Sequence, residues 1–261
     1  MEMAQKVIDI AFAMDMWIFG GYVRDVIVRG EQKFRDIDIC CEKKKYCANQ
    51  FIRTLACFFN ITTHQTNEKS MYSNHKLHTL TIQDRGTKQS VRIDVLVYEG
   101  TFNKWCKDTT VDFSCNLFYS SYNTYIGLRY VPKFLRYSAN PMKTLLDMTR
   151  KKECVRIWDV QVIDECQAGH IFKIHLRAKN LMKCGWFFLD LEVFMSNLMF
   201  FEMINHPLTL TLCKSTYTYM KKLQTSRIIH ELPRSEITKK IGFYLQDTQE
   251  TEDFPRAQEL S

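Results

Sequence analysis

The stretch of sequence that decides the fold is WIFGGYVRD, residues 17–25. Its three apolar residues at 17–19 form a short predicted strand, and residues 22–29 carry helix-like spacing. Between them, Gly20 and Gly21 let the backbone approach a ligand closely, and the N–H groups that open a helix favour an anion. An isolated glycine pair is also typical of a plain structural turn, so the neighbouring residues decide. With them, the stretch predicts a turn that holds a triphosphate.

Acidic residues lie on two further predicted strands. The segment RDIDIC, residues 35–40, alternates polar and apolar residues, so Asp36 and Asp38 share one face of a strand. The segment RIDVL, residues 92–96, alternates in the same way and carries Asp94. Carboxylate oxygens are the ligands that Mg²⁺ prefers, and like charges beside a buried strand favour a compensating cation. The acids therefore predict a magnesium site; the alternatives are solvated acids and, for the second strand, an ion pair with the preceding arginine.

Short motifs in residues 15–150 share one order and spacing with a known family. They are GGYVRD at 20–25, RDIDI at 35–39, HTLT at 78–81, IDV at 93–95 and DFSCN at 112–116. Together they resemble the head-domain signature of the class II tRNA nucleotidyltransferases, which are the CCA-adding enzymes, and of bacterial poly(A) polymerases. Both belong to the polymerase-β-like nucleotidyltransferase superfamily.

The resemblance implies a fold and a domain organisation. We expect an α+β fold in which a mixed-sheet nucleotidyltransferase head with flanking helices, residues 1–150, precedes an all-helical neck-like domain, residues 151–261, with a frayed C-terminus. Pro132 and Asn140-Pro141 interrupt the pattern before the boundary, and helix-like spacing follows it, for example at residues 172–185.

The resemblance also implies a reaction and its cofactor. An RNA 3′-hydroxyl would attack the α-phosphate of a nucleoside triphosphate, ATP or CTP, and pyrophosphate would leave. Asp36, Asp38 and Asp94 would be the catalytic residues and would bind two Mg²⁺ ions, or Mn²⁺ in their place. Asp36 and Asp38 would bridge the two ions, and Asp94 would bind the ion that activates the hydroxyl. Arg35 would add positive charge or pair with Asp25 or Asp36.

Further residues are implied to bind the nucleotide. In the resemblance, the diglycine and Arg24 hold the β- and γ-phosphates, and Asp112 with Asn116 shapes the sugar side of the pocket. Arg177 lies in the short match LRA at 176–178, with an ordinary surface arginine as the alternative. The full set is Gly20, Gly21, Arg24, Asp25, Asp112, Asn116 and Arg177.

The sequence also departs from the family. Thr110 and Val111 stand where the family has two arginines, and neither acid of its base-reading motif is present in residues 168–177. The chain after Gly185 is short for a tRNA-binding body. These departures leave two alternatives open: a nucleotidyltransferase that modifies a protein or a small molecule, and a catalytically weak binding module with the same fold.

Bulk composition limits the partners. The net charge of +7, from 36 basic and 29 acidic residues among 261, suits an anionic partner such as a nucleotide or RNA. The ten cysteines form no CxxC pair, which indicates reduced thiols in a cytoplasmic protein rather than a cysteine zinc site. His75 and His78 form an isolated HxxH, which we interpret as a strand lead-in. Acidic residues interrupt the apolar segment at 186–204, so no membrane span is expected.

Overall fold

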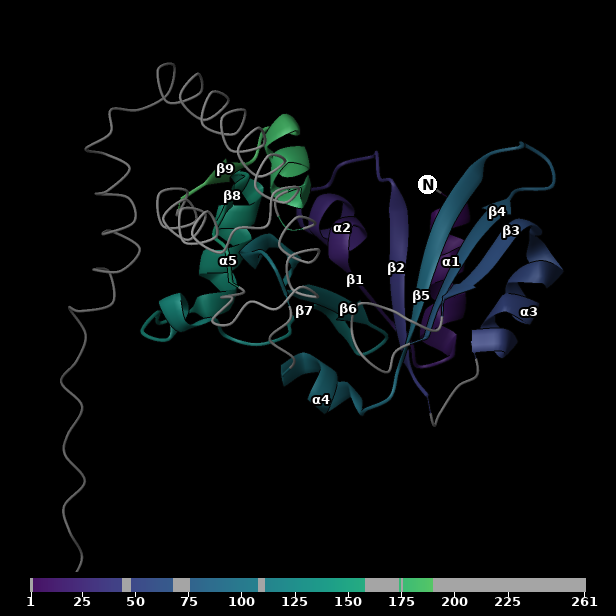
Figure 1. The fold of residues 1–261 in the computed structure, drawn as a ribbon, viewed down its shortest axis with the longest axis horizontal. Coiled ribbons are helices and arrows are strands. Elements are labelled where there is room, and N and C mark those ends of the chain that lie inside the picture. The colour runs from purple at the N-terminus through teal and green to yellow at the C-terminus, as the bar shows by residue number, and fades with distance from the viewer. Residues whose placement is uncertain are drawn as a thin grey trace, which may run out of the picture.

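The computed structural model describes residues 2–43, 48–67, 76–107, 111–157, 174 and 176–189. Within these ranges the fold is α+β, as predicted (Figure 1). The helices are α1 (Glu2–Ala13), α2 (Gly20–Tyr22), η1 (Val23–Val28), α3 (Ala48–Phe58), α4 (Phe102–Lys107), η2 (Ser114–Asn116), η3 (Lys133–Leu135) and α5 (Pro141–Arg150). The strands are β1 (Trp17–Phe19), β2 (Asp36–Glu42), β3 (Asn60–Asn67), β4 (Lys76–Gln83), β5 (Ser90–Tyr98), β6 (Phe118–Ser121), β7 (Thr124–Leu128), β8 (Glu153–Cys154) and β9 (Phe187–Phe188).

One mixed sheet organises the molecule. Its strand order is β3-β4-β5-β2-β1-β6-β7, and β2 runs parallel to β5 whereas the other neighbours are antiparallel. Figure 1 shows the sheet extending from β3 at one side to β6 and β7 at the other, with α5, β8 and β9 beyond that second end. The parallel pair stands at the centre, which places the two acid-bearing strands side by side.

The two faces of the sheet differ because residues alternate along each strand. Ile37 and Ile39 of β2 are buried in the main core together with Phe51 of α3. Helix α1 adds apolar residues at helical spacing, such as Val7 and Ile8, to the same core. The opposite face of β2 and β5 carries the acids.

Several predicted elements differ in detail. The helix expected at residues 22–29 already begins at Gly20, and from Val23 to Val28 it is a π-helix. The Asn140-Pro141 step, interpreted as part of a joint, starts α5: the Asn140 side chain accepts a hydrogen bond from the N–H of Lys143 at 3.0 Å. Strand β3 was not predicted, because nearly all its residues are polar and exposed.

The part of the chain beyond residue 150 is described only in part. Residues 176–183 are helical, in agreement with the helix expected at 172–185. Cys154, Ala178 and Phe188 pack with Phe113 in a second buried cluster. The described part of the expected all-helical domain also contains the paired strands β8 and β9, so it is not helical throughout. Residues 190–261, where further helices were expected, lie outside the described residues. Among the described helices, none has the length and apolar character needed to cross a membrane.

Candidate active site

The acids of β2 and β5 lie side by side. In the parallel register Asp38 is directly opposite Asp94, and Asp36 is opposite Arg92. Neighbouring strands are about 4.8 Å apart, so side chains on the same face of paired positions are in reach of one another. The register therefore brings Asp38 and Asp94 together, with Asp36 one step along the same face.

The diglycine turn is packed against Asp38. Phe19, the last residue of β1, is opposite Asp38 across the antiparallel pair, so the turn that follows begins beside this acid. Gly20 has φ +70°, and a Cβ atom on it would lie 2.3 Å from Oδ2 of Asp38. The backbone N–H of Gly21 donates a hydrogen bond to the Asp38 carboxylate. Only glycine fits at position 20, for steric and conformational reasons alike.

The electrostatics of the acid group favour a proton or a cation. Burial, together with the neighbouring charges of Asp36 and Asp94, raises the pKa of Asp38 to about 7. The charge of Arg35 and the hydrogen bond from the Gly21 N–H lower the pKa of Asp38, but not enough to cancel these raising effects. A carboxyl group that holds its proton up to neutral pH marks a place where negative charge is concentrated.

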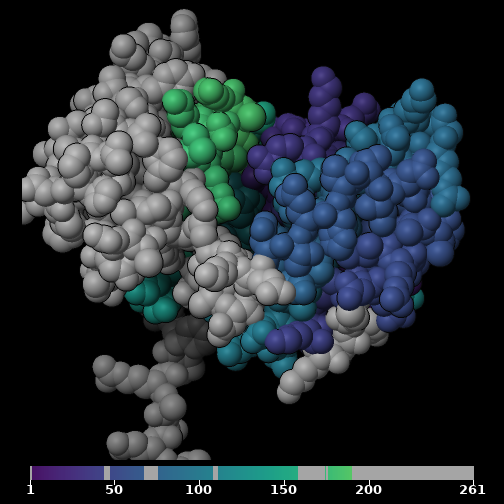
Figure 2. Space-filling model, turned by 45° about the vertical axis from the view of Figure 1, so that its right-hand side comes forward, coloured from purple at the N-terminus to yellow at the C-terminus, as the bar shows by residue number. Residues whose placement is uncertain are grey.

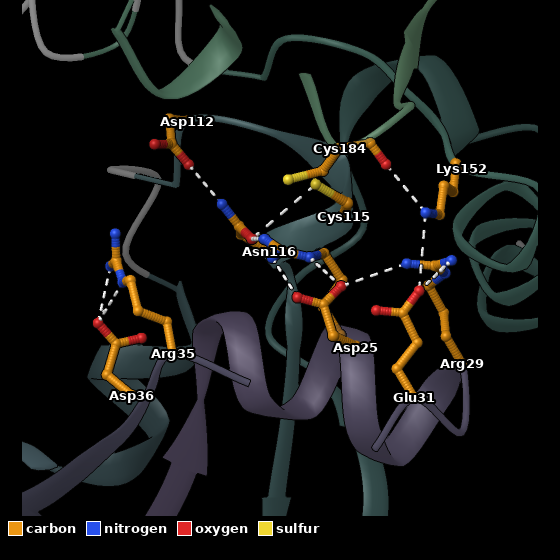
Figure 3. A network of polar contacts seen from close by, with 11 residues as sticks. Asp25, Arg29, Glu31, Arg35, Asp36, Asp112, Cys115, Asn116, Lys152 and Cys184 are labelled. Carbon is orange, nitrogen blue, oxygen red and sulfur yellow. Dashed lines mark hydrogen bonds and ion pairs between the residues drawn. The ribbon is translucent and has the colours of Figure 1, made fainter. Parts of the chain in front are cut away.

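Two of the three acids are paired with arginines. Arg35 contacts Oδ2 of Asp36 through Nε at 2.8 Å and Nη2 at 2.7 Å (Figure 3), and Arg92 contacts Asp94 at 3.2 Å. Both ion pairs were among the alternatives considered for the sequence. In this arrangement, no three His, Cys, Asp or Glu side chains of the described residues lie close enough together to hold a metal ion.

The acid group nevertheless fits a divalent cation in its chemistry. It offers carboxylate oxygens, the hard donors that Mg²⁺ prefers, from one face of two adjacent strands. Their mutual repulsion is visible in the raised pKa of Asp38, and a cation would relieve it. Arg35, whose side chain is 85% exposed, can leave Asp36 without disturbing the core.

Arg24 anchors a polar network beside the diglycine turn, and Figure 3 shows its partners Asp25 and Asn116 together with Asp112. Its guanidinium binds both carboxylate oxygens of Asp25, at 2.9 and 2.5 Å, and donates to Oδ1 of Asn116 at 2.9 Å. A Cβ atom on Gly21 would lie 3.6 Å from Nη2 of Arg24, so the guanidinium stands next to the turn. Three of the residues expected to bind nucleotide are thus joined.

The network continues to the far side of the site. The Asn116 side chain donates to Oδ1 of Asp112 at 3.0 Å, and Nη1 of Arg177 donates to Oδ2 of Asp112 at 2.7 Å. Asp112 is buried, whereas the Arg177 side chain is 53% exposed. Arg177 is therefore an exposed helix arginine that also pairs with a buried acid. Its role in nucleotide binding stays a prediction.

Trp186 is a site residue that the sequence did not indicate. Its buried indole lies 5.4 Å from the guanidinium carbon of Arg24 and 5.5 Å from that of Arg29. Arg29 also contacts Asp25 at 3.5 Å. Cation–π contacts of this kind hold an arginine in place. Nothing local to residue 186 reveals its partners, because they are more than 150 positions away.

The structure describes only some of the positions at which the sequence departs from the family pattern. Val111 is buried in the main core, so this position provides packing rather than a phosphate contact. Thr110 and residues 168–173 lie outside the described residues.

Comparisons with known proteins leave the family open. No protein-family model matches the chain, and no curated protein matches it. Among solved structures, a presumed nucleotidyltransferase from H. pylori aligns over 89% of this chain and 96% of its own, with 10% identity and a TM-score of 0.31. The protein JHP933 from Helicobacter pylori aligns over 95% and 96%, with 9% identity and a TM-score of 0.33. Scores this low do not establish a common fold, so the functional argument rests on the site.

Proposed function

We propose that the chain is a metal-dependent nucleotidyltransferase that transfers nucleotides from ATP or CTP to an RNA 3′ end. The observation that carries the proposal is the placement of Asp38: it is opposite Asp94 on the neighbouring strand and in contact with the turn at Gly20. In a bound metal–triphosphate complex, the metal needs carboxylate ligands, and the phosphates need a turn without side chains that they can approach closely. The paired acids and the diglycine turn provide these two features. The sequence motifs support the same class of reaction.

The acids would hold the metal. Asp36, Asp38 and Asp94 would supply the oxygen ligands, and Arg35 and Arg92, which contact Asp36 and Asp94, would have to release them. Magnesium bound there would neutralise phosphate charge and lower the pKa of the attacking hydroxyl. Asp38 has to lose its proton first, because a protonated carboxyl is a poor ligand.

The chain's other residues position the substrates. The 3′-oxygen would form a bond to the α-phosphorus while the bond from that phosphorus to the oxygen bridging the α- and β-phosphates breaks. Pyrophosphate would leave with that oxygen, and the hydroxyl proton would pass to water. Gly20, which has no side chain, would let the Asp38 carboxylate lie close to a polyphosphate bound at the turn. Arg24, with N–H groups beyond those bound to Asp25 and Asn116, would add positive charge. Arg177 and Asp112 lie at the end of the hydrogen-bonded network that begins at Arg24, and they would border the nucleotide site. Catalysis then depends on orientation and charge rather than on a covalent intermediate.

A second candidate function is a nucleotide-binding module without turnover. The ion pairs Arg35–Asp36 and Arg92–Asp94 favour it, because they neutralise two acids without any metal. A third, transfer to a protein or a small molecule, is favoured by the missing base-reading acids in residues 168–177.

Labelled nucleotides separate the three functions. The full chain is incubated with each triphosphate in turn, Mg²⁺ and a mixed RNA pool, beside the variants Asp38→Asn and Asp9→Asn. Asp9 is an exposed acid on α1 and serves as the matched control. We expect longer RNA with the parent and the control, and at least a hundredfold less with Asp38→Asn. Label on protein would support the third function, and triphosphate binding without any product would support the second.

A further inference from the structure

Two histidines and a threonine meet at the edge of the sheet. Nε2 of His64 on β3 lies 3.1 Å from Nδ1 of His78 on β4. The hydroxyl oxygen of Thr66 lies 3.2 Å from the same Nδ1 and 3.4 Å from Nε2 of His64. The strand register explains the meeting, because Thr66 is directly opposite His78 and His64 is two positions before Thr66. Three potential metal ligands thus form a compact triangle.

The cluster is separate from the acid group. His78 is opposite Val95, a core residue, whereas the next residue, Thr79, is opposite Asp94. Because side chains alternate across a strand, the histidines and the acids project from opposite faces of the sheet. The nucleotidyl-transfer proposal makes no use of these histidines.

The triangle has the dimensions of a metal site. Imidazole nitrogens bind zinc at about 2.0–2.1 Å, and in a tetrahedral site this places the ligand atoms about 3.3–3.4 Å apart. The observed separations of 3.1, 3.2 and 3.4 Å are hydrogen-bond distances close to this spacing, and the ring centres of the two histidines are 5.4 Å apart. The two nitrogens face each other, so the rings would have to turn to direct both lone pairs at one ion. Nitrogen ligands favour zinc and similar transition metals over magnesium.

We propose that His64, His78 and Thr66 form a binding site for a divalent transition metal ion of the zinc type. Two imidazole nitrogens and the hydroxyl oxygen are the protein ligands, and water completes the tetrahedron. The ion would cross-link β3 to β4. Strand β3 stands to gain from this link, because it is the edge of the sheet and almost all its side chains are exposed, as the blue surface in Figure 2 illustrates.

The surroundings of His78 suit a ligand role. Burial lowers the pKa of His78, and the nearby charges of His64 and Lys76 lower it further, so these surroundings favour its neutral ring. A metal ligand must be neutral imidazole. Lys76 also repels a cation, so replacing it with glutamine should tighten metal binding.

Metal titrations of the full chain test the proposal. Zn²⁺ binding is measured by calorimetry after chelator treatment, and Co²⁺ is used as a probe whose visible absorption reports tetrahedral coordination. We expect one bound equivalent to be weakened at least tenfold in His64→Gln. The same equivalent should persist in Cys57→Ser, which removes an exposed thiol, and in Asp38→Asn, which alters the acid group. The thermal midpoint should rise with Zn²⁺ in the parent and not in His64→Gln.

Two results would overturn it. One is zinc binding by His64→Gln with the stoichiometry and affinity of the parent, which would mean that the histidines only share a hydrogen bond. The other is loss of the equivalent in Cys57→Ser, which would assign it to a thiol. His64 is exposed on an edge strand, so its variant should fold even if one at the buried His78 does not. Either outcome is independent of nucleotidyl transfer, because Asp38→Asn separates the two sites.

Discussion

Arg177 donates a hydrogen bond to Asp112 at 2.7 Å, although the two residues are 65 positions apart in the sequence. The contact links the helix at 176–183 to the segment before η2. Through Asn116 it reaches Arg24 and the diglycine turn. The part of the chain beyond residue 150 therefore contributes directly to the candidate site.

Replacing Arg177 with glutamine should destabilise the protein. Asp112, whose side chain is 7% exposed, would keep its bond to Asn116 but lose its charged partner. Because Arg177 is half exposed, we expect a loss of about 1–2 kcal/mol in the free energy of unfolding, measured in urea. Arg150→Gln is the control, since its pair with Asp147 is exposed and 3.7 Å long. Equal losses in both variants would contradict the structural role.

Gly20→Ala and Gly30→Ala form a matched pair. Both glycines have φ +70°, so alanine carries the same backbone strain, about 1–2 kcal/mol, at either position. No atom lies within 4 Å of a Cβ on Gly30, whereas at Gly20 the methyl group would displace Asp38. We expect Gly20→Ala alone to abolish Mg²⁺-dependent activity, and its unfolding free energy to fall further than that of Gly30→Ala. Full activity in Gly20→Ala would show that the close contact is unimportant.

The raised pKa of Asp38 predicts a pH dependence of stability. The folded state binds this proton more tightly than the unfolded state, whose pKa is near 3.8. The contribution of this bound proton to the free energy of unfolding is therefore complete below about pH 4, and it is lost as the pH rises to about 7. It amounts to at most about 4 kcal/mol. Unfolding without divalent metal should show Asp38→Asn becoming more stable than the parent above pH 7. A parent-minus-variant difference that does not change with pH would exclude the shift.

Arg35→Gln should move this titration upward. Arg35 lowers the pKa of Asp38, so its removal leaves the effects of burial and of the neighbouring acids opposed by the Gly21 N–H alone. The midpoint, followed by NMR of the Asp38 carboxyl carbon, should shift to higher pH. Arg53→Gln, an exposed arginine on α3, should leave the midpoint unchanged. A downward shift in Arg35→Gln would mean that its charge does not act on Asp38.

The acid-bearing strands and the turn could be predicted because their patterns are local. Alternation over a few residues places Asp36 and Asp38 on one face, and two glycines between apolar segments indicate a turn. Their mutual placement is not local. The register that sets Asp38 opposite Asp94 depends on how β2 and β5 pair, and no single segment contains that information.

What the sequence did not reveal depends on long-range packing. Trp186 contacts two arginines near the start of the chain, and its own neighbours give no indication of this. His64 lies on β3, a polar edge strand without apolar alternation, so neither the strand nor its contact with His78 was predicted. Such residues become visible only when the pairing of distant strands and helices is known.

The parallel pairing of β2 with β5 also determines at which stage of synthesis and folding the acid group can form. Parallel neighbours need a long connection, and here α3, β3 and β4 all lie between them in the chain. A nascent chain that has emerged only as far as β4 contains the diglycine turn and two of the acids but not Asp94. Closing such a distant contact is slow, so the acid group should assemble after the local pairing of β3 with β4 and of β4 with β5.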